Sequence, residues 1–269
     1  MKIILNKKKL VKIINKEKKL GFVPTMGAIH NGHISLIKKS IRQCNKTVVS
    51  IFINKPQFGR KIDYQKYPRI LKKDIFKLKR LKIDYLYIPS FKQIYPNGPN
   101  KKIKINNFEK KLCGKFRPGH FRAVVDVINR FIKIIEPERI FFGNKDMQQL
   151  KIIEDFVKKN YPKIKVVGCK TIRDKCGLAL SSRNFLLTAK EKRNACKIYN
   201  ILSSKKREII KNRKFLFSIR KKILKLDVSK IDYIKVLDIN KIIKPYKKLN
   251  NYKIFIAYYF NIIRLIDNI

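Results

Sequence analysis

The stretch from Gly21 to Ser35, GFVPTMGAIHNGHIS, constrains the fold more than any other part of the chain. Gly21 to Pro24 predict the end of a buried strand, and His30 to His33 open an amphipathic helix. A strand that turns into a helix brings open backbone N–H groups and the positive helix end to one point. Gly27 and Gly32 leave room for phosphate oxygens beside the backbone. The stretch therefore predicts an anion site.

Two of the chain's three histidines lie in this turn. His30 and His33 are three residues apart, so they share one face of a first helical turn and can both reach one phosphate group. Histidine pairs at this spacing also occur on ordinary surfaces and among metal ligands. A metal site is disfavoured because no nearby Cys, Asp or Glu completes a tetrahedral set. We therefore favour a phosphate site.

The first two thirds of the chain alternate strand-like apolar runs with helical patterns, which is typical of a parallel α/β sheet. A short helix is expected within 6–19, before the first strand, and a long connection without periodicity over 91–122. Further strands are expected over 47–53, 84–88, 139–142 and 163–168, with helices over about 69–81 and 124–135.

Polar residues follow the carboxyl ends of two of these strands, where open α/β sheets bind ligands. Asn54 and Gln57 follow one strand, although such residues often only form turns. Lys145 and Asp146 follow another, where they suit a phosphate and a ribose hydroxyl. A helix N-cap aspartate beside a surface lysine explains the second pair equally well, so both interpretations stay open.

The character of the chain changes near residue 172. Charged helices are expected over 187–225 and strands over 233–237 and 253–260, so we predict domains over 1–171 and 172–269, the second a small α+β domain. Ser181, Ser182 and Arg183 lie at the junction, where two hydroxyls and a planar cation suit phosphate oxygens. An ordinary polar surface loop is the alternative interpretation.

Composition excludes several classes of protein. Of the 269 residues, 45% are hydrophobic and 32% are charged. No run approaches the roughly 20 apolar residues of a membrane helix. Lysines interrupt the N-terminal segment too early for the apolar core of a signal peptide. The cysteines are odd in number and form no CxxC pair, so we expect reduced thiols in a cytoplasmic protein without a membrane partner. They are Cys44, Cys113, Cys169, Cys176 and Cys196.

The formal net charge of +49 has two explanations. Dense Lys and Arg would release counterions from a nucleic acid, whereas A/T-rich codons would enrich Lys, Ile and Asn together. The lysines spread through every segment instead of forming one patch, and aromatic residues do not interleave with them. We therefore favour codon bias, and expect no specific nucleic-acid partner but non-specific polyanion binding at low salt.

Taken together, seven segments resemble the pantoate–β-alanine ligases, members of the HxGH nucleotidyltransferase superfamily. They are VPTMGAIHNGH (23–33), SIFINKPQFG (50–59), YPR (67–69), RPGHFR (117–122), FGNKDMQQL (142–150), GLALSSRN (177–184) and RLIDN (264–268). The resemblance implies a Rossmann-like nucleotide- and pantoate-binding domain followed by a smaller lid domain, in a cytoplasmic homodimer. It also implies that ATP and Mg²⁺ convert pantoate to pantoyl adenylate, which β-alanine attacks to give pantothenate, with AMP and pyrophosphate released.

The resemblance also assigns roles to residues. His33 is the proposed proton donor, because an imidazolium can neutralise charge on phosphates. Gln57 and Gln149 are expected to bind pantoate, and Gln57 is also expected to lie near β-alanine. Mg²⁺ is held mainly by ATP oxygens and water, with no protein ligand assigned. The residues expected to contact ATP are Met26, Gly27, Ala28, Ile29, His30, Asn31, Gly32, His33, Gly143, Asn144, Lys145, Asp146, Ile172, Leu180, Ser181, Ser182 and Arg183.

The sequence departs from the family pattern at several positions. Pro56 lies one place later than the usual proline, so the backbone before Gln57 is expected to change shape. Cys176 replaces an Asp, and Leu180 replaces a Met at similar volume. Two other functions stay open, namely a nucleotidyltransferase with a different acceptor and a nucleic-acid-binding protein on an enzyme scaffold. The two glutamines and the RPGHFR segment argue against the first of these.

Overall fold

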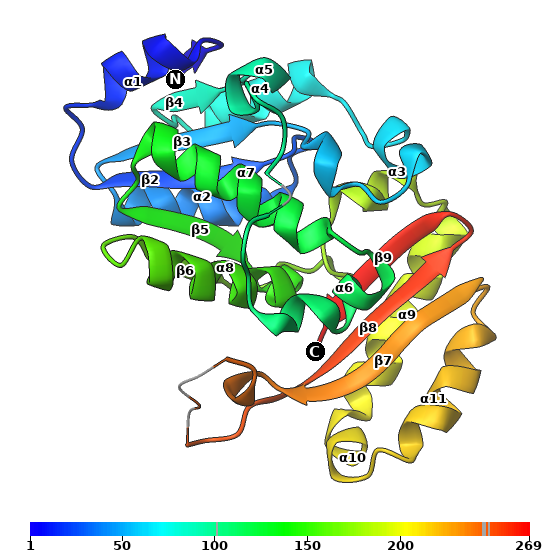
Figure 1. Ribbon diagram of the computed structural model, residues 1–269. Coiled ribbons are helices and arrows are strands. Elements are labelled where there is room, and N and C mark those ends of the chain that lie inside the picture. Colours follow the sequence, from blue (N-terminus) through cyan, green and yellow to red (C-terminus); the bar gives the residue numbers. More distant parts are fainter. Residues whose placement is uncertain (101, 244–245, 247) are drawn as a thin grey trace. The chain divides into compact units, whose positions relative to one another are not determined.

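The computed structural model describes residues 1–100, 102–243, 246 and 248–269 (Figure 1). The chain forms two compact units. The first consists of residues 1–144 and 148–170, and the second of residues 145–147 and 171–269. Among the described residues, no helix has both the length and the apolar character that crossing a membrane requires.

A six-stranded parallel sheet forms the centre of the first unit. Its order is β1 (Lys2–Ile4), β4 (Tyr85–Tyr87), β3 (Lys46–Ile51), β2 (Leu20–Thr25), β5 (Arg139–Gly143) and β6 (Lys165–Cys169). The predicted parallel α/β fold is confirmed. The short helix expected within 6–19 is present at Lys7–Ile14, but it does not precede the first strand. Strand β1 comes before it and was missed, because three residues are too few to show a periodic pattern.

Helices cover both faces of this sheet. On β2, Phe22 packs against Phe131 of α7, with ring centroids 5.3 Å apart, whereas Val23 belongs to a buried cluster with Leu36 and Ile37 of α2. Successive strand residues point to opposite faces, so α7 and α2 lie on opposite sides. The helices are α1 (Lys7–Ile14), α2 (Asn31–Gln43), α3 (Lys61–Gln65), α4 (Leu71–Arg80), α5 (Phe91–Ile94), α6 (Cys113–Phe116), α7 (His120–Ile135) and α8 (Met147–Asn160).

The long connection expected over 91–122 contains only short elements before α7 begins. They are α5, the 3-10 helix η2 (Asn107–Lys110) and α6, while its Lys101 lies outside the described residues. These elements are too short to produce a recognisable hydrophobic period. Two more 3-10 helices, η1 (Lys55–Gln57) and η3 (Asn144–Asp146), follow the carboxyl ends of β3 and β5.

The second unit contains an antiparallel sheet in the order β7 (Lys230–Asp238), β8 (Tyr252–Phe260) and β9 (Ile263–Asn268). Its helices are α9 (Ala189–Ser204), α10 (Lys206–Lys211), α11 (Phe215–Leu224), η4 (Ser182–Leu186) and η5 (Ile239–Lys241). Leu202, Ile223 and Ile254 lie in one buried cluster between these helices and the sheet. The predicted α+β character is confirmed. Strand β9 was not predicted, because Arg264 interrupts its apolar pattern. In the structure Arg264 is buried and forms an ion pair with Asp232 at 2.9 Å.

Candidate active site

The turn between β2 and α2 has a backbone that few residues can adopt. Gly27 and Ala28 have φ of +80° and +50°, and His30 then forms the N-cap of α2, which begins at Asn31. A Cβ on Gly27 would lie 3.1 Å from a carboxylate oxygen of Asp74. Glycine therefore fits this position both by conformation and by space.

Asp74 of α4 holds this turn. Its two carboxylate oxygens accept hydrogen bonds from the backbone N–H of Ala28 at 2.8 Å and of Ile29 at 2.7 Å. Lys77, one turn further along α4, donates to the carbonyl of Ile29 at 2.7 Å. Asp74 is only 1% exposed, and this burial raises the pKa of its carboxyl group against the opposing effect of the two backbone hydrogen bonds. The geometry of the turn thus depends on one buried carboxylate.

The two histidines of the turn lie against each other, as their spacing predicted. Their ring centroids are 4.0 Å apart. Nδ1 of His30 accepts from the N–H of Gly32 at 3.1 Å, and Nδ1 of His33 accepts from the N–H of His30 at 3.5 Å. A neutral imidazole that accepts at Nδ1 carries its proton on Nε2. These caps fix the orientation of both rings at the start of α2.

Gln57 lies next to this turn. Its side-chain Nε2 is 3.0 Å from the sulfur of Met26, and its Oε1 accepts from Asn54 at 3.1 Å. Its backbone carbonyl is bound by His120 Nδ1 at 2.7 Å and by Arg117 at 3.2 Å. The third histidine of the chain therefore positions Gln57, a role that the sequence did not reveal.

The shifted proline before Gln57 fits its surroundings. Pro56 lies in the first turn of η1, where a missing N–H costs no helical hydrogen bond. The backbone from Asn54 to Gln57 therefore closes into a 3-10 turn, and Asn54 itself is fixed by the hydroxyl of Tyr95 at 2.7 Å.

Strands β2 and β5 are neighbours in the sheet, so Gly143, at the carboxyl end of β5, and the histidine turn belong to the same edge. Asn144 follows directly in η3. Of the two glutamines in α8, Gln148 is 5% exposed and bonds to the backbone of Cys113 at 3.0 Å, which makes it a brace for the scaffold. Gln149 is half-buried, and its predicted contact with a ligand stays a prediction.

The remaining predicted contacts belong to the second unit. The carbonyl of Lys145 accepts from Asn268 of β9 at 2.8 Å, and the Lys145 ammonium lies 3.6 Å from the Asp146 carboxylate. The Lys145 side chain is only 16% exposed, so it is not a surface lysine. Ser181 forms the N-cap of η4, the segment that contains Ser182 and Arg183.

A short hairpin leads into this serine loop. Leu180 donates its N–H to the carbonyl of Ile172 at 2.9 Å, and Arg173 and Ala179 form a β-bridge. The guanidinium of Arg173 binds both carboxylate oxygens of Asp267 in β9, at 2.6 and 2.9 Å. No pattern in the sequence indicated this pair beyond the position of Asp267 in the RLIDN segment.

Replacing Arg173 by lysine is expected to lower the free energy of unfolding by about 2 kcal/mol, because an ammonium cannot bind both oxygens of Asp267 at once. Urea denaturation followed by circular dichroism measures this change. Lys205→Ala is the matched control, because its ion pair with Glu208 is about half exposed and is worth less than ~0.5 kcal/mol. Equal effects of the two substitutions would contradict the anchoring role of Arg173.

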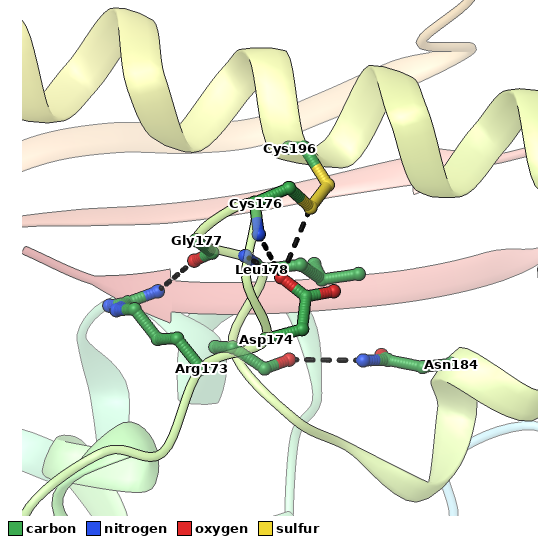
Figure 2. The surroundings of a disulfide bond; sticks show 8 residues. Arg173, Asp174, Cys176, Gly177, Leu178, Asn184 and Cys196 are labelled. Carbon is green, nitrogen blue, oxygen red and sulfur yellow. Dashed lines mark hydrogen bonds between the residues drawn. A yellow bond between two sulfur atoms is a disulfide. The ribbon is translucent and has the colours of Figure 1, made fainter.

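The cysteine prediction was wrong for one pair. Cys176 and Cys196 form a disulfide across 20 residues of sequence, with their Cα atoms 5.5 Å apart (Figure 2). Spacing alone cannot reveal such a pair, because only the fold brings the hairpin and α9 together. Cys44, Cys113 and Cys169 are buried and lie outside this disulfide.

Comparisons with known proteins agree over nearly the whole chain. A family model described as pantoate-beta-alanine ligase matches residues 2–269. A pantothenate synthetase from Sulfurihydrogenibium sp. (strain YO3AOP1) is 40% identical over 263 residues, which span 94% of this chain and 92% of that protein. The crystal structure of pantothenate synthetase from Thermus thermophilus has a TM-score of 0.89 and 30% identity, and the match covers 100% of this chain and 99% of that one.

A second solved structure is that of pantoate-beta-alanine ligase from Francisella tularensis, complexed with beta-gamma ATP and beta-alanine. It has a TM-score of 0.83 and 39% identity, and the match covers 100% of this chain and 97% of that one.

Proposed function

Because the chain belongs to the pantoate–β-alanine ligase family, we propose that it forms pantothenate through an enzyme-bound pantoyl adenylate. The chain is a ligase, and joining pantoate to β-alanine is the activity that its relatives support. The pantoate carboxylate attacks the α-phosphate of ATP and displaces pyrophosphate. The β-alanine amine then attacks the acyl carbon, and AMP leaves.

The close contact of the His30 and His33 rings, whose centroids are 4.0 Å apart, is the observation that carries this proposal. Attack on a polyphosphate needs positioning and charge neutralisation more than a strong base. The Nδ1 caps orient both rings so that each Nε2–H can donate to phosphate oxygens, and Asp74 fixes the backbone that bears them. In this proposal His33 is the catalytic donor to the reacting phosphate, and residues from Met26 to Gly32 contact the nucleotide.

Gln57 and Gln149 are the proposed pantoate-binding residues. An amide offers both a donor and an acceptor, which matches the hydroxyl and carboxylate groups of pantoate. Gln57 is the better positioned of the two, because His120 and Arg117 hold its backbone while its amide contacts Met26. The relative from Francisella tularensis was solved with beta-alanine, which supports the same second substrate here.

ATP is the proposed co-substrate, as the complex of the Francisella tularensis relative supports. The residues proposed to contact it outside the histidine turn are those that the family resemblance assigns, namely Gly143, Asn144, Lys145, Asp146, Ile172, Leu180, Ser181, Ser182 and Arg183.

Mg²⁺ would bridge ATP phosphates and water, which is its usual environment. Among the described residues, the cluster with metal-ligand geometry is Asp174, Cys176 and Cys196. Its sulfur atoms do not suit Mg²⁺. Held by ATP, the ion would supply neutralisation of phosphate charge. The homodimer and the cytoplasmic location implied by the resemblance stay predictions, as does the lid role of the C-terminal domain.

Transfer of oxygen from pantoate to AMP tests the adenylate step. Pantoate labelled with ¹⁸O in its carboxylate is incubated with ATP, Mg²⁺ and β-alanine, and the masses of the products are measured by mass spectrometry. We expect one ¹⁸O atom in AMP, because the carboxylate oxygen bonded to the α-phosphate leaves with it. Label in inorganic phosphate, with ADP as the nucleotide product, would instead show an acyl phosphate and contradict the proposal. A reaction without β-alanine controls for hydrolysis.

A further inference from the structure

The disulfide lies at the tip of the hairpin that precedes the serine loop. Arg173 and Ala179 pair across this hairpin, and Cys176 lies at its turn. Ser181, the first residue of the serine loop, comes two residues after Ala179. Asp174 shapes the turn by accepting from the N–H groups of Cys176 at 3.1 Å and Leu178 at 2.9 Å (Figure 2). Only a few residues separate the hairpin tip from Ser181, so a change in the position of the tip also affects the position of Ser181.

The hairpin tip packs closely against one face of α9. Cys196 and Tyr199 are three residues apart on that helix, so they share a face. Gly177 has φ of +94°, and a Cβ at this position would collide with the Tyr199 ring. The guanidinium of Arg173 lies 4.1 Å from the centre of the same ring. The contact is therefore close enough for a covalent bond without rearrangement of the backbone.

The two sulfur atoms differ in access to solvent. Cys176 is exposed, whereas Cys196 is 8% exposed in α9. Their Cα separation of 5.5 Å is a usual one for a disulfide. A small oxidant can thus react first at Cys176, and Cys196 is in place to resolve the product.

We propose that the Cys176–Cys196 pair is a redox-operated lock on the ATP-binding serine loop. The inference rests on the proposed function, because it assigns ATP to the loop that the lock holds. In the locking step, the Cys176 thiolate attacks a low-molecular-weight disulfide and releases one thiol. The Cys196 thiolate then attacks the Cys176 sulfur and releases the second thiol. Two protein thiols are oxidised and one external disulfide is reduced to two thiols.

The locked state holds the serine loop in the conformation described here. Reduction removes the covalent link, while the ion pair of Arg173 with Asp267 keeps the base of the hairpin in place. The loop should therefore become more mobile without unfolding. Ordering it again on ATP binding costs affinity, so the KM for ATP should rise on the order of threefold to tenfold in the reduced enzyme. The KM for β-alanine should not change.

The test compares full-length protein oxidised with glutathione disulfide against protein reduced with a phosphine. Non-reducing peptide mapping establishes the cross-link, and steady-state kinetics with varied ATP gives the KM. Hydrogen exchange measured on residues 174–184 gives a readout that does not need turnover. We expect faster exchange and a higher KM for ATP in the reduced protein.

Single-residue variants separate the lock from general effects of oxidation. Cys176→Ser and Cys196→Ser should each behave like the reduced enzyme in both buffers. Cys44→Ala, whose side chain lies in the first unit, should keep the full difference between the two buffers.

Three results would overturn the lock. One is pantothenate formation with the same KM for ATP and the same exchange in both forms, which leaves the proposed function standing. Another is failure of the cross-link to form. A third is stoichiometric binding of Zn²⁺ by the reduced protein that blocks oxidation, because Asp174, Cys176 and Cys196 would then be a metal site. Absence of pantothenate in both forms, with the exchange difference intact, would instead overturn the proposed function alone.

Discussion

Replacing His33 by alanine is expected to lower kcat by about 10²- to 10⁴-fold, the usual range for the loss of a positioned proton-donating group. The ring of His33 has one structural role and one proposed catalytic role. Its Nδ1 accepts from the His30 N–H at the start of α2, and its Nε2–H is the proposed donor to the phosphate. Single-turnover formation of pyrophosphate measures the chemical step directly. The alanine variant removes both roles, so it cannot tell them apart alone.

His33→Asn and His33→Gln form a matched pair that separates the two roles. The Asn carbonyl can replace Nδ1 as the cap acceptor, so stability should recover while activity stays low. The Gln amide reaches the position of Nε2–H, so part of the activity should recover. If the Asn variant were as active as the unmodified enzyme, the catalytic role of His33 would be wrong.

Replacing Asp74 by alanine is expected to lower the free energy of unfolding by about 3 kcal/mol and to remove most of the activity. The reason is that the buried N–H groups of Ala28 and Ile29 lose their shared acceptor, and hydrogen bonds to charged groups contribute about 1.5–3 kcal/mol each. The turn also has φ values that need external support. Urea denaturation and pyrophosphate release measure the two effects.

Two further variants control this result. Asp74→Asn keeps one carbonyl acceptor for two N–H groups, so its stability and activity should be intermediate. Lys73→Ala changes an exposed residue on the same helix and should alter stability by less than about 0.5 kcal/mol. Unchanged activity in the alanine variant at Asp74 would show that the turn holds its shape without the carboxylate.

Local patterns predicted the parallel sheet and the histidine turn because both depend on short-range sequence. The strands at β2, β3 and β5 are apolar runs, and the turn after β2 contains its own glycines and histidines. Asp74 was missed because it acts across more than 40 residues of sequence. A signal did exist, since Asp74 and Leu78 lie four residues apart on the buried face of α4. A charged residue on an apolar helix face indicates a buried partner.

Neighbouring residues of the same type were harder to separate. Gln148 and Gln149 look alike in the sequence, yet helix geometry turns them about 100° apart, so one braces α6 and the other is half-buried. The resemblance to the family, and not the local pattern, pointed to Gln149. The disulfide was missed for the same reason as Asp74, because its partners meet only in the folded second unit.

The caps at the start of α2 tie the two histidines to the helix itself. Each histidine uses one ring nitrogen to accept a backbone N–H of the first helical turn. A substitution at either position therefore removes a helix cap together with the ring. The start of α2 and the histidine pair thus cannot vary independently of each other in sequence.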